Sequence, residues 1–457
     1  MKTIWQKTAQ TTKAGNWFYE FTAAEDRQFD HYLIPYDIFT NLAQARMLQK
    51  VGIFSLEESK STIQALSNLY LQWENGSFRL SDDDEDVHSA VEKYLTLKLG
   101  DIGKKIHTGR SRNDQVLTDI RLFLKKEIRS IVSEWLSIAE LLNKLAIQYR
   151  GVYFAGFTHT QPAMPTSVDA WAAGYLDLLL ADIESLQQAY EVNDCCPLGS
   201  AAGYGVPYFE VDREYLTHLL GFGKMQKNVT SSQLSRGTYE LRLIDALGYG
   251  AGTFNRMASD VVWYANPLLN LVELSDDQVS GSSIMPQKRN PDAWELIRGS
   301  HHEFSGWSVQ MSSLSTNLSS GYHRDLQLAK KFVLQSTFAA NRLGVAVKHA
   351  LSGLKFNIES ARQSLTPDLM ATHKANEYVR QGMTFREAYR KVAAELDSIN
   401  VDAYDDLSAT YNHSGAPGHY NGNHYLEQIK NSQNWLDHEI DKWGGIKENL
   451  FHFNPKN

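Results

Sequence analysis

The sequence contains a long stretch without a helix breaker, from Gln115 to Arg150, in which neither glycine nor proline occurs. Within it, large apolar residues recur every three or four positions, the spacing that places them on one face of an α-helix. These residues are Ile120, Leu124, Ile128, Ile131, Trp135, Ile138, Leu142 and Leu145. The stretch therefore predicts one long amphipathic helix, which needs other helices beside it to bury its apolar face.

Three further segments carry broad apolar stripes at the same spacing and predict helices at about residues 167–192, 231–264 and 291–314. Long helices side by side indicate a bundle. Four glycines between residues 237 and 252 weaken the second of these helices, since each costs about 1 kcal/mol relative to alanine, but they would permit close helix approach. Strand signals are few and the turn-rich stretches lie between helices, so we expect a mainly α fold.

A chain of 457 residues is long enough for roughly three domains. We expect an N-terminal helical domain, a central helical bundle and a small C-terminal helical domain, at residues 1–106, 107–363 and 364–457. The last boundary rests on SLTPD at 364–368, where Pro367 suits a first helical turn and Thr366 can act as N-cap. Residues 411–423, rich in Gly, His, Asn and Ser, predict a loop within this last domain.

The composition is that of an ordinary globular protein, with 42% hydrophobic and 21% charged residues. The formal net charge of -8 disfavours non-specific binding to nucleic acid or to an anionic membrane. Cys195 and Cys196 are adjacent, which excludes a disulfide between distant parts of the chain and fits a reducing compartment. The first ten residues lack the apolar core of a signal peptide, and no segment offers about twenty uncharged apolar residues. We therefore expect a cytoplasmic protein without nucleic-acid or membrane partners.

Two polar segments precede predicted helices in the first quarter of the chain. Five acidic residues, Asp82 to Asp86, are typical of an acidic helix N-terminus, and the alternative is a ligand-binding role for His88. Residues 107–115, HTGRSRNDQ, lie directly before the longest helix. Their arginines, serine and asparagine at a helix N-terminus suit a carboxylate-bearing ligand, whereas Ser111 or Asn113 as a simple N-cap would explain one residue only.

Two later segments carry candidate reactive groups. His159 lies between two threonines in FTHTQPAMP at residues 157–165, and a lone histidine is more often structural than catalytic. Residues 281–292, GSSIMPQKRNPD, combine small residues with two cations at a predicted helix start, which indicates a mobile loop able to surround an anion. A phosphate loop is the alternative, but neither this segment nor GSAAGYG at 199–205 has the required spacing.

The sequence GSSIMPQKRNP, from Gly281 to Pro291, resembles the third signature GSSxMPxKxNP of the fumarase/aspartase superfamily. Gln287 before Lys288, with the block HTGRSRNDQVLTD at 107–119, is similar to the argininosuccinate lyase branch. The blocks EDVHSAVE, PLGSAAGYG, SGYHRDLQ and GMTFREAY extend the likeness from about residue 20 to residue 395. The resemblance implies three helical domains around a central bundle, and a homotetramer with each active site assembled from three subunits.

The resemblance also implies a reaction, the elimination of argininosuccinate to arginine and fumarate by removal of a succinyl proton. Ser282 matches the family's base, and Lys288 matches the lysine that stabilises the carbanion's carboxylate. His159 matches the histidine discussed as the acid–base partner, with Glu295 as the carboxylate that orients it. The implied substrate-binding residues are Ser111, Arg112, Asn113, Thr158, Asn290, Tyr322, Gln327 and Lys330.

Three departures from the family pattern concern the amine half of the substrate. The N-terminal WGGRF block has only IWQKT as its counterpart, residues 228–237 lack the common Asp-Arg-Asp, and Thr160 replaces a more usual leucine. The alternatives are a related C–N lyase that releases fumarate from another N-succinyl amine or aminopolycarboxylate, or a non-catalytic, crystallin-like relative. No metal-ligand spacing occurs in the sequence, His301 and His302 predict helix surface or a polar bundle contact, and we expect neither metal nor cofactor.

Overall fold

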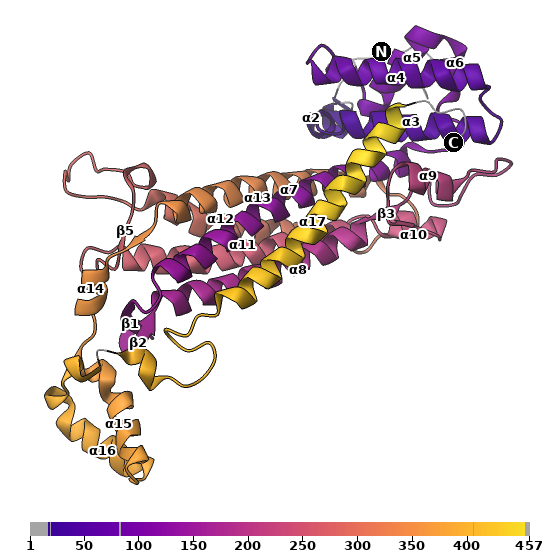
Figure 1. Ribbon diagram of the computed structural model, residues 1–457. Coiled ribbons are helices and arrows are strands. Elements are labelled where there is room, and N and C mark those ends of the chain that lie inside the picture. Colours follow the sequence, from indigo (N-terminus) through magenta and orange to yellow (C-terminus); the bar gives the residue numbers. More distant parts are fainter. Residues whose placement is uncertain (1–16, 19, 82–83, 405, 453–457) are drawn as a thin grey trace.

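The computed structural model describes residues 17–18, 20–81, 84–404 and 406–452, and these form a mainly helical protein with three parts (Figure 1). A helical unit near one end holds the helices between residues 20 and 105, long helices form the middle, and a small helical unit lies at the other end. This confirms the mainly α fold. The sequence IWQKT, which was expected to replace the WGGRF block, lies outside the described residues.

The N-terminal unit consists of short and medium helices. They are η1 (Glu20–Ala24), α2 (Glu25–Asp30), α3 (Ile34–Lys50), α4 (Leu56–Glu74), α5 (Val87–Leu99) and α6 (Asp101–Lys105). Asp86 caps α5 by accepting the backbone N–H of Ser89 at 2.7 Å, so the expected acidic helix start is confirmed at this residue. Most of α3 is buried, because it packs against α4, α5 and the first bundle helix.

Five long helices form the central bundle: α7 (Arg112–Gln148), α8 (Val168–Asn193), α11 (Thr238–Tyr264), α12 (Asp292–Leu314) and α13 (Leu328–Ser352). All eight apolar residues that predicted the longest helix are buried. Burial of each such aliphatic or aromatic side chain contributes about 1.5–3 kcal/mol, which is why the spacing was a reliable signal. Helix α7 begins at a capping box in which Ser111 and Asp114 bind each other's backbone N–H.

The segment expected as one helix at 231–264 is two helices, α10 (Val229–Leu234) and α11, so that prediction was wrong. The chain turns at Gly237, whose φ of +78° suits glycine, and a Cβ there would lie 2.9 Å from the Cβ of Ser315. Close packing against the end of α12 imposes this break. Gly250 confirms the expected close helix approach, because a Cβ at this position would overlap the ring of Trp135.

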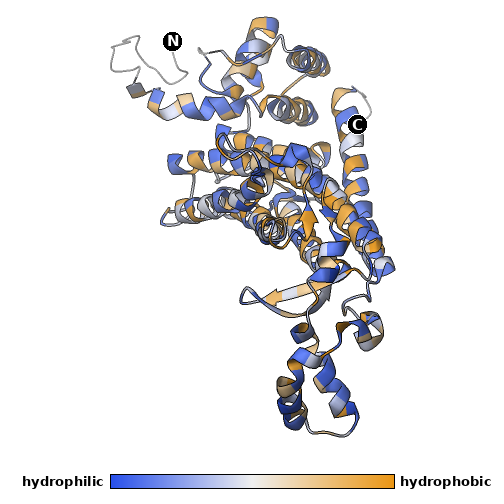
Figure 2. Cartoon of the chain, turned by 90° about the vertical axis from the view of Figure 1, so that its left-hand side faces the viewer, coloured by the Kyte–Doolittle hydropathy of each residue, from blue (hydrophilic) through white to orange (hydrophobic). Residues whose placement is uncertain are grey.

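Short strand pairs join the ends of the bundle helices. The hairpin of β1 (Tyr153–Thr158) and β2 (Gln161–Ser167) connects α7 to α8 and projects from the bundle (Figure 2). The other strand pairs are β3 (Cys195–Cys196) with β4 (Lys224–Met225), and β5 (Val272–Glu273) with β6 (Lys355–Phe356). The short helices in the connections are α9 (Arg213–Leu219), η2 (Asp276–Gln278) and η3 (Arg324–Gln327). The hairpin was not expected, because Pro162 and Pro165 within it indicate turns.

The C-terminal unit starts after α14 (Ile358–Gln363), which ends just before the break expected at Ser364. Its elements are η4 (Pro367–Met370), α15 (Ala371–Arg380), α16 (Phe385–Glu395), η5 (Leu396–Ser398), η6 (Val401–Tyr404) and η7 (Leu407–Thr410). Pro367 opens a 3₁₀ turn with Thr366 at the N-cap position, but the Thr366 hydroxyl donates to the Asp368 carboxylate and accepts no backbone N–H of the turn. Hydrophilic residues predominate on the two helices at the foot of the molecule (Figure 2).

The last helix, α17 (Gly422–Phe451), leaves this unit and runs back along the bundle (Figure 1). It follows the loop expected near residues 411–423, packs against α7 and α8, and ends beside α3. The thirty residues of α17, which belong to the last predicted domain, thus lie along the bundle. The domain boundaries at 107 and 364 stay predictions. Within the described residues, no helix combines the length and apolarity that a membrane crossing requires.

Candidate active site

The candidate residues form two groups at opposite ends of the bundle (Figure 1). One group, at the end that carries the N-terminal unit, is Ser111, Arg112, Asn113, Tyr322, Gln327 and Lys330. The other group, at the opposite end, is Thr158, His159, Ser282, Lys288, Asn290 and Glu295. Between them lies α7, whose 37 residues span about 55 Å at 1.5 Å per residue. One chain therefore presents two partial sites.

The start of α7 organises the first partial site. The Ser111 hydroxyl accepts the backbone N–H of Asn113 at 3.3 Å, which confirms Ser111 as N-cap. Asp114 is fully buried, and its carboxylate accepts the N–H of Ser111 at 2.9 Å and those of Gly199 and Ala201 at 2.8 Å each. Burial raises the pKa of Asp114 to about 6, although these N–H groups favour the ionised form. This carboxylate fastens the 199–205 loop to the candidate anion site.

Both candidate cations at this end lie in ion pairs. Arg112 contacts Asp86 at 2.9 Å, and Lys330, which is buried, contacts Asp30 at 2.5 Å and Asp26 at 2.8 Å. Burial would lower the pKa of Lys330, but the two carboxylates raise it above its usual value. The charge of each cation is thus largely neutralised within the chain.

Tyr322 and Gln327 connect this partial site to other segments. The side-chain amide of Gln327 donates to the backbone carbonyl of Thr22 at 2.7 Å. The guanidinium of Arg236 lies over the ring of Tyr322, 4.8 Å from its centroid, and donates to the carbonyl of Asn113 at 3.3 Å. Arg236 therefore joins two segments that carry predicted substrate-binding residues.

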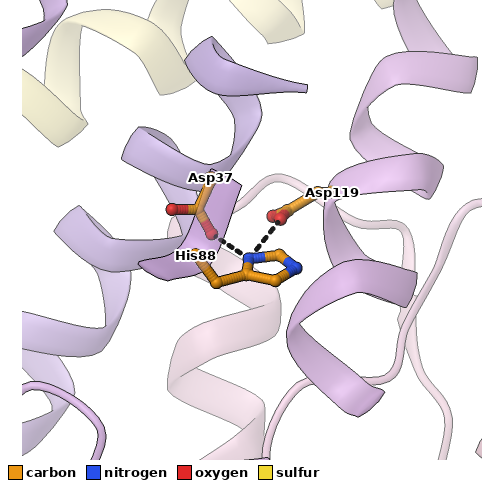
Figure 3. A group of neighbouring side chains, drawn as sticks. All are labelled: Asp37, His88 and Asp119. Carbon is orange, nitrogen blue, oxygen red and sulfur yellow. Dashed lines mark hydrogen bonds and ion pairs between the residues drawn. The ribbon is translucent and has the colours of Figure 1, made fainter. Parts of the chain in front are cut away.

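A buried cluster of Asp37, His88 and Asp119 lies where α3, α5 and α7 meet (Figure 3). The His88 Nδ1 atom is 2.7 Å from Asp37 Oδ1 and 3.6 Å from Asp119 Oδ2. Burial would lower the pKa of His88, but the surrounding carboxylates raise it to about 9, so the ring is cationic at neutral pH. The structure places His88 in an ion-pair network that joins three helices.

The same three side chains form the group that could hold a metal ion among the described residues, because their ligand atoms lie within 4.8 Å of one another. Protonated His88 and Arg110, however, already balance the charges of Asp37 and Asp119. Neighbouring amide and hydroxyl groups donate further hydrogen bonds to both carboxylates. The donor set fits a hydrogen-bonded ion-pair network better than a cation site.

At the opposite end, the loop between η2 and α12 holds Ser282. An antiparallel bridge closes the base of the loop, where Ser280 and Asn290 exchange N–H to carbonyl bonds of 3.0 and 2.8 Å. The Ser282 Oγ atom accepts the backbone N–H of Ile284 at 3.3 Å and that of Met285 at 3.2 Å. Two donors aimed at one hydroxyl oxygen would stabilise negative charge on it.

A cavity of about 970 Å³ lies beside this loop, and its lining includes Lys288, Asn290 and Glu295. Its volume suits a small organic ligand. Neither Ser282 nor His159 lines it. Glu295 lies 3.9 Å from Arg298, and among the described residues no hydrogen bond or ion pair joins Glu295 to His159. The expected pairing of these two side chains does not occur within one chain.

His159 and Thr160 form the two-residue turn of the β1–β2 hairpin, with φ values of +53° and +61°. Positive φ at both central positions defines a type I′ turn, which usually holds asparagine and glycine. A β-branched threonine is strained in this conformation, and such strain is common at functional sites. The turn presents Thr158 and His159 as exposed side chains at the hairpin tip.

Comparisons with known proteins identify the family. A family model described as Lyase matches residues 10–306. The argininosuccinate lyase of Thermotoga neapolitana is 41% identical over 374 residues, which cover 82% of this chain and 94% of the relative. The argininosuccinate lyase of Phocaeicola vulgatus is 36% identical over 415 residues, which cover 91% of this chain and 92% of that relative. The chain belongs to the argininosuccinate lyase family.

Two solved structures share the fold. EDDS lyase aligns with a TM-score of 0.79 and 21% identity, over 92% of this chain and 91% of that chain. The class II fumarase of Schistosoma mansoni aligns with a TM-score of 0.69 and 18% identity, over 82% of this chain and 89% of the fumarase chain. These likenesses confirm the fold that the motif GSSIMPQKRNP implied.

As a member of the argininosuccinate lyase family, the chain is a carbon–nitrogen lyase, and the roles of its twelve candidate residues stay predictions. Asp114 and Arg236 were not predicted as part of the site. Asp114 lies inside the HTGRSRNDQ block, so its place at a helix start was visible although its contacts with Gly199 and Ala201 were not. Arg236 lies in the segment that departs from the family pattern, and its burial carries no sequence signal.

Proposed function

We propose that this protein catalyses the reversible elimination of argininosuccinate to L-arginine and fumarate, in the cytoplasm and as a step of arginine biosynthesis. One observation carries the proposal. In a chain 41% identical to an argininosuccinate lyase, the Ser282 hydroxyl oxygen lies against two loop N–H groups, beside a cavity lined by Lys288. This arrangement supports a serine base and a nearby cation, which the elimination requires.

In the proposed reaction, Ser282 removes the proton from the succinyl carbon β to the departing nitrogen. The loop N–H groups of Ile284 and Met285 stabilise its alkoxide form, and Lys288 stabilises the dianionic carboxylate that results. The electron pair of the broken C–H bond then forms the double bond of fumarate as the C–N bond breaks. The leaving nitrogen takes a proton, for which His159, oriented by Glu295, is the proposed donor.

We also infer a homotetramer in which different subunits supply the parts of each active site. The support is geometric: the two partial sites are separated by the length of α7, about 55 Å, whereas a substrate of this kind is far shorter. Substrate binding by Ser111, Asn113 and Tyr322 together with catalysis by Ser282 thus calls for another copy of the chain. The separation of His159 from Glu295 points the same way.

The test follows the ultraviolet absorbance of fumarate released from argininosuccinate, beside a panel of N-succinyl amines and aminopolycarboxylates. We expect Ser282→Ala to lower kcat about 10²–10⁴-fold, with a smaller effect on KM, because a general base acts in the transition state. Ser283→Ala, the adjacent serine, should lose far less. Undiminished turnover by Ser282→Ala would remove it as base, and a wild type that cleaves only another substrate would refute the specificity.

A further inference from the structure

Arg236 differs from Arg112 and Lys330, the two candidate cations at the N-terminal end of the bundle. It is 6% exposed, yet among the described residues no carboxylate lies within ion-pair distance of its guanidinium. Its contacts are the carbonyl of Asn113 and the ring of Tyr322, both neutral. Arg112 and Lys330, in contrast, each touch at least one carboxylate. Unlike these two candidate cations, Arg236 therefore contacts segments that carry predicted substrate-binding residues without touching a carboxylate.

Among the described residues, the carboxylates that act on Arg236 do so from beyond ion-pair distance. After the Tyr322 ring, the acids that act on it are Glu240, one turn further along the chain, and Asp26, which contacts Lys330. The buried Glu240 carboxylate also acts on the buried guanidinium of Arg121. Arg121 uses its donors on the Cys195 carbonyl and on neutral side chains. Burial lowers the pKa of Arg236, the direction expected for a cation without a carboxylate in contact. Both carboxylates that act on Arg236 are therefore shared with another cation, Arg121 or Lys330.

Arg236 also has donors left for a ligand. A guanidinium carries five N–H groups in a planar fork that matches a carboxylate, and the backbone bond to Asn113 occupies one of its terminal nitrogens. The residue that follows, Gly237, has no side chain and so supplies no carboxylate to Arg236. A buried charge without a counter-ion is costly, and such cost is typical of sites where a ligand supplies the partner.

We propose that Arg236 is a substrate-binding residue that takes a carboxylate of the substrate, so that Asn113, Tyr322 and Arg236 form one carboxylate-binding face. This inference rests on the proposed function for the identity of that carboxylate. Argininosuccinate offers two sources, the succinyl half and the amino-acid half. The rival explanation is structural, in which Arg236 only fastens the start of α7 to α11 through the Asn113 carbonyl.

The test compares Arg236→Gln and Arg236→Lys with a matched control, Arg213→Gln. Arg213 lies at the same end and donates to the carbonyls of Leu198, Gln226 and Lys227, a backbone-fastening role. We measure KM and kcat for argininosuccinate, and the inhibition constants of succinate and of arginine. Arg236→Gln should raise KM and one of the two inhibition constants about tenfold or more, with Arg236→Lys in between, because a charge-assisted hydrogen bond is lost.

The inhibitor that weakens identifies the source, succinate for the succinyl half and arginine for the amino-acid half. Arg213→Gln should lower the thermal midpoint without changing either inhibition constant. A folded Arg236→Gln or Arg236→Lys variant with both constants unchanged would overturn the proposal. If the wild type releases no fumarate from argininosuccinate, the proposed function fails, but the anion site is still tested. Succinate or arginine should then raise the thermal midpoint of the wild type and not that of Arg236→Gln. An equal rise of the thermal midpoint in both proteins would refute the site.

Discussion

Thr160 occupies a backbone conformation that costs a β-branched residue energy, next to the histidine proposed as proton donor. Its φ of +61° lies in the left-handed region, which asparagine visits more readily than threonine. We therefore expect Thr160→Asn to raise the free energy of unfolding by about 1 kcal/mol, because the strain is relieved while the turn is kept. The measurement is the midpoint of urea unfolding.

Thr158→Asn is the matched control, because Thr158 is also an exposed threonine and lies in the adjoining strand β1. Strand positions favour threonine over asparagine, so this substitution should lower stability slightly. A gain in Thr158→Asn equal to that in Thr160→Asn would show that the turn is not the cause.

At this scale, the candidate residues were named from the sequence because they lie in short motifs that match the family pattern, and their roles stay predictions. The N-cap role of Ser111 follows from local chemistry, whereas Ser282 was named from its match to the family motif. The part that Arg236 plays could not be predicted. It depends on Asn113 and Tyr322, which are 123 and 86 positions away in the chain, and only tertiary packing brings the three together.

Among the helices, the contact of α3, α5 and α7 depends on a buried charge that titrates. Below pH 6.5 His88 is protonated in both the folded and the unfolded chain. Between pH 6.5 and its folded-state pKa of about 9, His88 keeps its proton in the folded chain but loses it on unfolding. The stabilisation by His88 is therefore fully present below pH 6.5 and is lost as pH rises through 9. Burial and the neighbouring Asp37 charge also raise the pKa of Asp119, which contributes a change in the same direction.

The comparison is between wild type and the double variant His88→Asn with Asp119→Asn, which keeps hydrogen-bonding groups but removes both charges. Asp37, Asp86 and Arg110 face the cluster in both proteins. We expect the stability advantage of the wild type to shrink between pH 6.5 and pH 9, measured by urea unfolding at several pH values. An advantage that stays constant over this range would contradict a cationic His88 in the folded state.

The elements themselves were predictable where a local pattern decides them. Helices α7, α8 and α12 follow from apolar spacing and from breakers at their ends. The break at Gly237 and the β1–β2 hairpin do not, because each depends on distant contacts. Ser315 packs against Gly237, and strand β2 contains two prolines that indicate turns on their own.

For the whole molecule, the return of α17 along the bundle shows the same limit. The sequence predicts a helical C-terminal domain, but the course of α17 is fixed by partners far away in the chain. Arg129 on α7 donates to the carbonyl of Glu439 at 2.7 Å, and Arg46 on α3 binds the carbonyls of Asn449 and Leu450 at 3.1 Å. Partial sites at both ends of one elongated chain then become the main constraint on function.

This constraint gives a prediction that separates shared from self-contained active sites. Asn113→Ala damages the partial site at the N-terminal end, and Ser282→Ala damages the one at the other end, so each variant alone should be nearly inactive. When equal amounts are unfolded together and refolded, a site built from different subunits has both parts intact in about one case in four. The mixture should therefore regain about a quarter of the wild-type rate of fumarate release.

The control mixture pairs Ser282→Ala with Lys288→Ala, which damage the same loop. Every loop in that mixture carries one defect or the other, so no recovery is expected however the subunits are arranged. Size-exclusion chromatography with light scattering gives the mass of each refolded assembly, which should be that of a tetramer. Recovery in the first mixture and not in the second supports shared sites. No recovery in either mixture, with tetramers formed, would mean that each chain builds its own site, and the 55 Å between the two partial sites would then have to close by a rearrangement of the chain.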